Sequence, residues 1–406
     1  MSSGTDRIDS LDVLRGFAIL GILIMNIQAF ANVSAAYVNP SLAGPLTGSD
    51  FWIWLGSHVL AEYKFITIFG ALFGAGIVLF AERAEAAGAD AHARHRRRMF
   101  SLGCIGLAHA LLLWYGDILL LYAMIGMIAF HFRNEDTGRL LRIAAVLYLV
   151  PVAVAFAMTG GMNLMGEETY QQFVRESWDL KPELIAAEVA TYQGSWSGQF
   201  SQRAQTLADA YLWMVLTEQG WRVLAIMLVG MAAYRSGLLK GEWPLDAYRR
   251  MFLVGAGVGI PLILWGALFN LTHDWEMRYS LYMGRQFNGL GAPLVSLAWI
   301  SLVIIALKKG WLPGLTTRLR AVGRMALTCY LLTTVICTTL FYGHGLGLFG
   351  TMDRAEQWLV VIAVWFVLLT FAPLWLRWFR MGPVEWLWRW ASYGRRPPFR
   401  TTTPSE

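Results

Sequence analysis

Long apolar runs separated by short polar stretches recur along the whole chain of 406 residues. Each run covers about 15–27 residues, the length with which an α-helix crosses a hydrocarbon layer of about 30 Å. The pattern predicts ten membrane-spanning helices. Their expected positions are residues 13–33, 62–82, 98–115, 118–132, 139–158, 208–234, 250–270, 290–307, 325–343 and 357–376.

The composition supports this interpretation. Hydrophobic residues make up 56% of the chain and charged residues only 15%, whereas about 25% of a soluble domain is charged. We expect an all-α, polytopic transmembrane bundle over residues 1–393 and a disordered cytoplasmic tail over residues 394–406. The long polar segment 159–205 is expected to form an insertion on the outer face, in which stretches 167–178 and 182–192 predict helices lying on the membrane surface.

Lysine and arginine gather in the loops after the second, fourth, sixth and eighth predicted spans and in the tail. The positive-inside rule places such loops in the cytoplasm, together with both chain termini. The net charge of +6 therefore follows from membrane topology, and we expect no nucleic-acid partner.

The stretch 106–126 carries the most informative polar residues, because two apolar segments are joined there by a very short turn. His109 lies inside the first segment and Asp117 in the turn. Titratable groups in hydrocarbon are costly unless paired or hydrated, so both are candidate functional residues. His109 is a natural general base, with Asp117 as its orienter. The alternatives are an interhelical hydrogen bond for His109 and a helix cap for Asp117.

Polar residues of the first apolar segment fall within one narrow stripe of its helix. At about 100° per residue, Asp12, Arg15 and Asn26 share this stripe. Arg15 is a candidate ligand for an anionic group that arrives from the cytoplasm. The alternative is an interfacial ion pair between Asp12 and Arg15, with a helix–helix hydrogen bond from Asn26.

A second polar group precedes the second predicted span. His58 and Glu62 are four residues apart and share a helical face, and Lys64 follows directly. This spacing predicts either a polar site near the outer surface or an interfacial cluster whose lysine extends to water. Arg285, in the outer loop 283–291, is a candidate clamp for an anionic or sugar-like group unless the loop is simply solvated.

Glycine and cysteine patterns point away from nucleotide and metal binding. Gly345, Gly347 and Gly350 match G-x-G-x-x-G, but they follow an apolar segment and no strand. We expect a tight turn that places His344 beside Tyr342. The three cysteines lie in apolar runs without the spacing of metal ligands, so no metal is expected.

Five blocks of the chain resemble, in the same order, the YeiB-like family of bacterial inner-membrane proteins, a domain of unknown function. The blocks are LDVLRGFAILGILIMN, KFITIFGALFGAG, GLAHALLLWYGDILLLYAMIG, GRMALTCYLL with FYGHGLGLFG, and MGPVEWLWR. They cover nearly the whole chain. The resemblance implies a multi-pass protein of the bacterial inner (plasma) membrane.

That family is distantly similar to a superfamily of membrane acyltransferases, which includes heparan N-acetyltransferases and envelope O-acyltransferases. The similarity depends mainly on D-x-x-R-G, here residues 12–16, followed by Asn26. It implies transfer of an acyl group, most simply acetyl, from cytoplasmic acyl-CoA to an envelope glycan or exported small molecule. The active histidine of those enzymes lies in or shortly after the first helix, where this chain has none, so His58 and His109 are the first available.

The favoured hypothesis is therefore an acyl-CoA-dependent membrane acyltransferase. Arg15 would hold the phosphates of acyl-CoA, His109 would act as the base with Asp117, and His58 would be the competing base. The other candidate substrate-binding residues are Asn26, Glu62, Lys64, Arg285 and His344. The alternatives are a proton-coupled transporter of a small polar or anionic solute and a non-catalytic membrane partner. A homodimer is compatible with the sequence.

Overall fold

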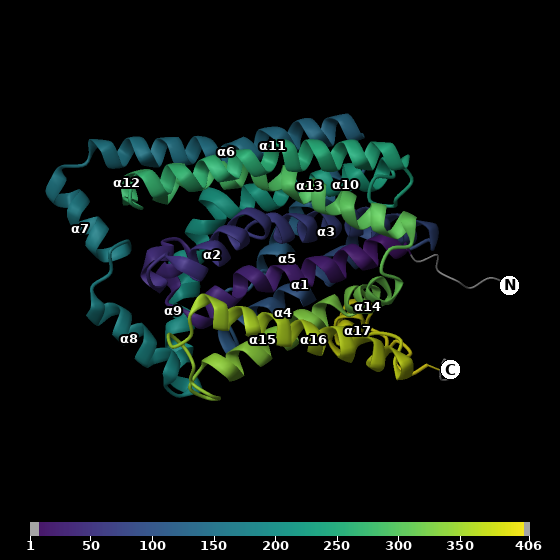
Figure 1. Ribbon diagram of the computed structural model, residues 1–406. Coiled ribbons are helices and arrows are strands. Elements are labelled where there is room, and N and C mark those ends of the chain that lie inside the picture. The colour runs from purple at the N-terminus through teal and green to yellow at the C-terminus, as the bar shows by residue number, and fades with distance from the viewer. Residues whose placement is uncertain (1–7, 402–406) are drawn as a thin grey trace.

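The computed structural model describes residues 8–401, and throughout this range the regular structure is helical (Figure 1). Seven helical segments in it are long and apolar enough to cross a membrane, or eight if the bent pair Pro313–Arg324 and Ala326–Phe341 is one span. The prediction of an all-α, polytopic membrane bundle is confirmed. The number of spans stays a prediction.

The helices of the first half are α1 (Asp9–Ala31), α2 (Gly48–Leu60), α3 (Lys64–Ala86), α4 (Ala91–Leu112), α5 (Leu119–Ala129), α6 (Thr137–Leu164), α7 (Glu167–Ser177), α8 (Pro182–Gln193) and α9 (Trp196–Met214). Those of the second half are α10 (Gly220–Arg235), α11 (Leu245–Thr272), α12 (Met277–Tyr279), α13 (Arg285–Lys309), α14 (Pro313–Arg324), α15 (Ala326–Phe341), α16 (Arg354–Trp378) and α17 (Pro383–Tyr393). Two π-helical turns, Val215–Gln219 and Ser280–Gly284, precede α10 and α13.

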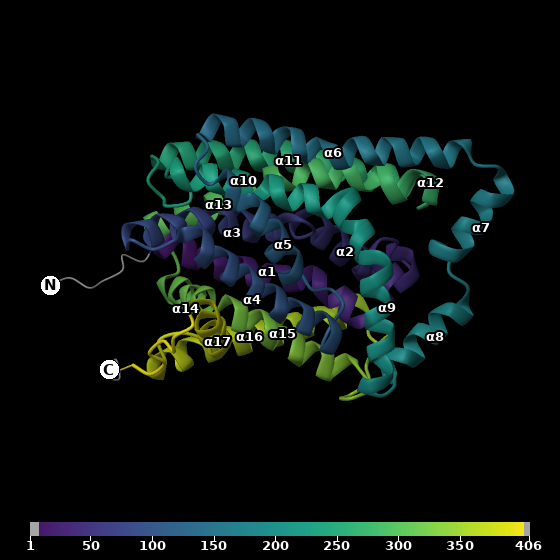
Figure 2. The same ribbon diagram turned by 180° about the vertical axis from the view of Figure 1, so that it is seen from behind.

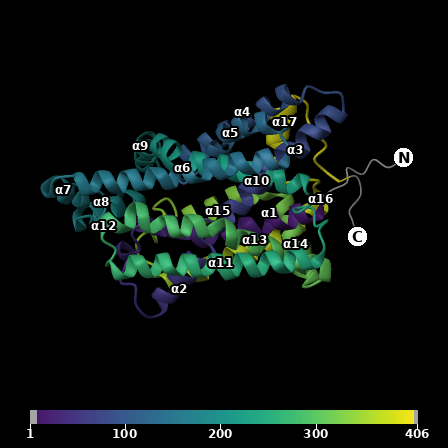
Figure 3. The same cartoon turned by 90° about the horizontal axis from the view of Figure 1, so that it is seen from above.

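The long helices run side by side, and α1 begins at the same end of the bundle at which α17 lies (Figures 1 and 2). We call this end the termini end and the opposite one the far end. Helices α1, α3 and α5 occupy the middle, between α6, α11 and α13 on one side and α14 to α17 on the other. Helices α7 and α8 lie at the far end, as the view from above also shows (Figure 3).

Each of the ten predicted apolar segments overlaps a helix, but their boundaries differ. The segment expected at 98–115 belongs to α4, which already begins at Ala91 because the basic stretch before it is helical too. The segment expected at 118–132 corresponds to α5, which has 11 residues, and a short 3-10 turn. Helix α5 is therefore shorter than α4, which has 22 residues, and than α1 and α3, which have 23 each.

The insertion and the tail differ in how far the structure tests them. Within 159–205, α6 continues to Leu164, and α7 and α8 form where the two amphipathic stretches predicted helices. Residues 394–401, expected to be disordered, instead pack on the bundle, because the Phe399 ring lies 4.7 Å from that of Phe379. Residues 402–406 of the expected tail lie outside the described range.

Glycines bring two pairs of helices into close contact. A Cβ on Gly16 of α1 would lie 2.0 Å from the carbonyl oxygen of Leu319 in α14. A Cβ on Gly74 of α3 would lie 2.0 Å from the carbonyl oxygen of Met227 in α10. Small residues permit such backbone approach, which stabilises helix pairs in membranes through packing and weak polar contacts. The glycine of D-x-x-R-G is thus a packing residue.

Candidate active site

His109 and Asp117, the central pair of the sequence analysis, are in direct contact. Helix α4 ends at Leu112, and a short loop folds back before α5 begins. This turn brings Asp117 Oδ2 to 2.7 Å from His109 Nδ1. Both side chains are buried, with 1% and 0% of their side-chain surface exposed. The hairpin bends as the orienter role of Asp117 requires.

Asp117 also accepts a hydrogen bond from the start of α5. Its Oδ1 atom lies 2.7 Å from the backbone nitrogen of Leu120. The two roles weighed in the sequence analysis, a helix cap and a partner for histidine, are therefore combined in one carboxylate. Gly106 makes room for this contact, because a Cβ there would lie 2.4 Å from the Leu120 nitrogen and 2.9 Å from Asp117 Oδ1.

The third member of the site, Thr334 of α15, was not predicted from the sequence. Its hydroxyl oxygen lies 3.0 Å from His109 Nε2, although the two residues are 225 positions apart. The ring of Tyr330, one turn earlier in α15, lies 5.2 Å from the imidazole. The pair of threonines at 333–334 in an apolar segment was the only sequence feature that could have indicated this role. It does not indicate which helix the two side chains face.

This geometry defines the chemistry available to His109. An ionised carboxylate can only accept hydrogen bonds, so Asp117 holds the proton of the neutral imidazole on Nδ1. Nε2 then carries the free electron pair and faces the Thr334 hydroxyl. A base, a group that orients it and a hydroxyl at its free nitrogen form the arrangement used in acyl transfer by activated hydroxyls.

A cavity of about 630 Å³ leads from the termini end toward this site. It follows α1 from Leu11 to Ile22, a rise of about 16 Å along the helix axis. Its inner wall includes Ile118, next to Asp117, and Tyr330, whose ring contacts His109. One layer of side chains therefore separates the cavity from the imidazole. The volume is that of a typical ligand pocket.

The two halves of the cavity differ in polarity. Seven arginines line it against two carboxylates, Asp12 and Glu385. The arginines are Arg15, Arg83, Arg94, Arg98, Arg324, Arg380 and Arg389. The inner half is apolar and is lined by Ile22, Phe69, Leu72, Phe73 and Leu102. The cavity thus suits a ligand with an anionic head and an apolar end.

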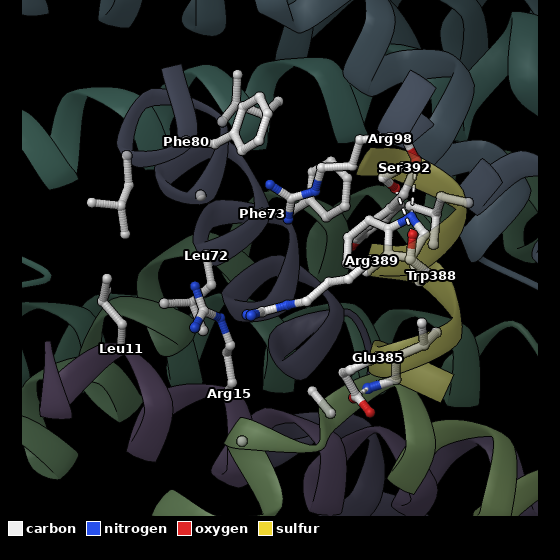
Figure 4. A pocket seen from close by; sticks show the side chains of 18 of the residues that line it. Leu11, Arg15, Leu72, Phe73, Phe80, Arg98, Glu385, Trp388, Arg389 and Ser392 are labelled. Atoms are coloured by element: carbon white, nitrogen blue, oxygen red, sulfur yellow. Dashed lines mark hydrogen bonds between the residues drawn. The ribbon is translucent and has the colours of Figure 1, made fainter. Parts of the chain in front are cut away.

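Arginines from three helices project into the same open space (Figure 4). Arg15 comes from α1, Arg98 from α4 and Arg389 from α17. Arg98 and Arg389 form no ion pair with a carboxylate in the described part of the chain, and the Arg98 guanidinium lies 4.5 Å from the Trp388 ring. Arg15 is paired with Asp12 at 2.9 Å, as the alternative interpretation predicted, yet it still lines the cavity.

Glu385 connects the cavity wall to the helix that carries Thr334. Helices α14 and α15 meet at 89°, which leaves the first N–H groups of α15 without intrahelical acceptors. Glu385 Oε1 accepts from the backbone nitrogens of Leu327 and Thr328, at 2.7 and 3.0 Å. Burial raises the pKa of this carboxyl although these hydrogen bonds act in the opposite direction.

Comparisons with known proteins place the chain in a family. A family described as "Protein of unknown function (DUF418)" matches residues 233–395. The chain is 36% identical over 393 residues to the uncharacterized protein YeiB of Escherichia coli (strain K12), covering 95% of this chain and 96% of that one. The chain belongs to this YeiB-like, DUF418 family.

A second relative has the same extent. The uncharacterized protein YxaH of Bacillus subtilis (strain 168) is 32% identical over 412 residues, covering 96% of this chain and 94% of that one. No solved structure matches the chain. The residues that match the DUF418 description include α15 and α17, which provide Thr334 and Glu385, but not the α4–α5 hairpin.

In this DUF418 chain the other predicted site residues form a separate network toward the far end. His58 Nδ1 contacts Glu62 Oε2, as their spacing predicted. Lys64 is fully buried and donates to the carbonyl oxygen of His58 and to Asn288 Oδ1. Asn288, the residue missed here, also donates to Glu62 at 3.0 Å. Lys64 does not extend to water, so the solvated interpretation of this lysine is wrong.

Arg285 does not lie in an outer loop as predicted, because α13 already begins at this residue, and it pairs with Glu218. The last two candidates, Asn26 and His344, belong to neither contact set. Asn26 is half-buried in α1, and His344 is exposed in the loop after α15, with its ring 6.0 Å from that of Tyr342. The tight turn at Gly345–Gly350 thus places His344 as predicted. His58, 230 positions from its partner Asn288, makes no recorded contact with the His109 site. Among residues 8–401 no group of three His, Cys, Asp or Glu side chains is arranged to hold a metal ion.

Proposed function

We propose that this protein is an acyltransferase of the bacterial inner membrane, with the termini end in the cytoplasm, that uses acyl-CoA as donor. The observation that carries the proposal is the arginine-lined cavity whose apolar inner end stops one side chain from His109. Arginine binds phosphate groups through paired, charge-assisted hydrogen bonds. The phosphates of CoA would bind Arg15, Arg98 and Arg389, and the acyl group would point along the apolar wall toward Tyr330.

The reaction would take place at His109 Nε2. An acceptor hydroxyl or amine would replace the Thr334 hydroxyl there and give its proton to the imidazole while its oxygen or nitrogen attacks the thioester carbonyl carbon. The carbon–sulfur bond would then break, and the imidazolium would return the proton to the CoA thiolate. Asp117 would stabilise the imidazolium at 2.7 Å. The Tyr330 ring would have to turn aside for the acyl group to reach Nε2.

Binding of acetyl-CoA to the purified full chain in detergent tests the donor site without knowledge of the acceptor. We expect saturable binding, and at least tenfold weaker binding for Arg98→Gln, because a hydrogen bond to a charged group contributes about 1.5–3 kcal/mol. Arg377→Gln is the matched control, since Arg377 is exposed at the same end but outside the cavity. Absence of binding, or equal loss in both variants, would contradict the proposal.

The catalytic assignment needs a second measurement. His109→Ala should retain acetyl-CoA binding but lose transfer of a labelled acetyl group to envelope glycans added as a mixture of acceptors. His58→Ala, which changes the other candidate base, should retain transfer. A transfer activity that survives His109→Ala and disappears in His58→Ala would assign the base to the far-end network instead.

A further inference from the structure

Three irregularities of the backbone converge on one place near the far end. The π-helical turn Val215–Gln219 contains Glu218, and the π-helical turn Ser280–Gly284 ends directly before Arg285. Tyr63, between α2 and α3, has a φ angle of +66°, which is unfavourable for an aromatic residue. π-helical turns and such backbone angles are enriched at functional sites, because surrounding structure has to maintain them.

The side chains at this place form a loosely bound charge triad. Glu218 lies between two arginines: its Oε1 is 3.6 Å from Arg222 Nε, and its Oε2 is 3.6 Å from Arg285 Nη1. Good guanidinium–carboxylate hydrogen bonds are about 0.7–0.9 Å shorter. Glu218 and Arg285 keep 21% and 23% of their side-chain surface exposed. Its one hydrogen bond from a described side chain, from the Tyr63 hydroxyl to Oε1, is long at 3.5 Å. The carboxylate is thus held by charge more than by hydrogen bonds, and part of it is exposed at the surface.

Arg222, in contrast, is fixed and buried. Its side chain is 4% exposed, and its Nη2 donates to Gln286 Oε1 at 2.8 Å. Gly289 makes room for it, since a Cβ there would lie 2.3 Å from Nη1. Its Nε has no hydrogen-bond partner among the described residues. The Glu218 carboxylate, 3.6 Å away, is its nearest acceptor and is too far for a good hydrogen bond, so a carboxylate that lies closer would satisfy this buried donor better.

We propose that Arg222 and Arg285 form a binding site for the carboxylate group of a ligand, and that Glu218 occupies this site in the unliganded protein. The cavity beside Arg222 measures about 10 Å³, which holds one water molecule at most. A ligand carboxylate therefore replaces Glu218 instead of adding to it. Each oxygen of Glu218 faces a different guanidinium, and a planar group with two oxygens reproduces that geometry. This site is independent of the proposed acyl transfer.

Thermal unfolding of the purified full chain in detergent, followed by tryptophan fluorescence, tests the site with sodium acetate as probe. Sodium chloride at equal ionic strength is the reference, and sodium phosphate tests for other anions. We expect acetate to raise Tm specifically, with the half-maximal concentration about tenfold lower in Glu218→Gln, because the internal competitor has lost its charge. If Glu218→Gln does not fold, Glu218→Asp replaces it in the same measurement, because its side chain is one methylene shorter and its carboxylate lies farther from the arginines.

The acetate effect should disappear in Arg285→Gln and persist in Arg278→Gln. Arg278 is the matched control, because it lies at the same end of the bundle and pairs with Glu167 and Glu276 outside the site. Equal shifts with acetate and chloride in the wild-type chain and in the Glu218 variants would overturn the proposal. An equal or larger shift with phosphate would overturn the carboxylate specificity.

Discussion

Replacing Gly106 by alanine should pull the His109–Asp117 pair apart. The new Cβ would lie 2.4 Å from the backbone nitrogen of Leu120 and 2.9 Å from Asp117 Oδ1. Ordinary contacts require the start of α5 to move by about 1 Å, which is enough to break the 2.7 Å hydrogen bond to His109. Overpacking of this kind costs about 1–3 kcal/mol, and we expect Tm to fall by a few degrees.

Gly103, one turn earlier in α4, is the control. A Cβ there would meet the Ala123 Cβ at 3.5 Å, an ordinary contact. Gly103→Ala should therefore be neutral or stabilising by up to about 1 kcal/mol, because alanine has the higher helix propensity. Thermal unfolding of both variants in the same detergent measures the difference. Equal Tm values for Gly106→Ala and Gly103→Ala would refute the close approach of α5 to α4.

Other variants separate roles within the same site. Asp117→Asn should lower acyl transfer by about 10²-fold or more and leave acetyl-CoA binding unchanged, because the amide favours the wrong imidazole tautomer. Thr334→Ser should retain transfer, and loss of activity in Thr334→Ser would indicate that the methyl group positions His109. The pKa of Glu385 is raised in the folded state, so the wild-type chain should lose stability as pH rises above the ordinary carboxyl range and this proton dissociates. Glu385→Gln has no such proton, so its stability relative to the wild-type chain should increase over the same pH range. Tm measured from pH 5 upward checks this sign, which a constant difference would contradict.

The fold followed from the sequence wherever a long apolar run was sufficient. Such a run must bury its backbone polar groups inside a helix, whatever it packs against, so the segments of α1, α3, α6, α11 and α16 were predicted. The position of the α4–α5 hairpin was predicted correctly, but the lengths of its two helices were not. The first half of α4 is basic, and its helicity depends on propensity and on packing against α17, which local apolar periodicity does not report.

The site was predicted only where its partners are close in the chain. His109 and Asp117 are eight residues apart and share one turn, so their contact was a reasonable hypothesis. Thr334 and Asn288 lie more than 220 positions from the residues they bind. Nothing in a single sequence states which helices become neighbours, and threonine or asparagine in an apolar segment has many ordinary roles. For the same reason, the sequence did not predict that seven arginines from distant segments line one cavity.

Acyl transfer and transport of a polar solute make opposite demands on the inner half of the cavity. A polar solute that passes Leu72, Phe73 and Leu102 loses hydration without gaining hydrogen bonds, at about 2–7 kcal/mol for each unpaired group. An acyl chain gains there about 0.8 kcal/mol per methylene, which is about fourfold in affinity. Butyryl-CoA should therefore bind more tightly than acetyl-CoA, and free CoA most weakly, until the chain reaches Tyr330. Equal affinity for free CoA and both acyl-CoAs would show that the apolar wall does not hold the acyl group.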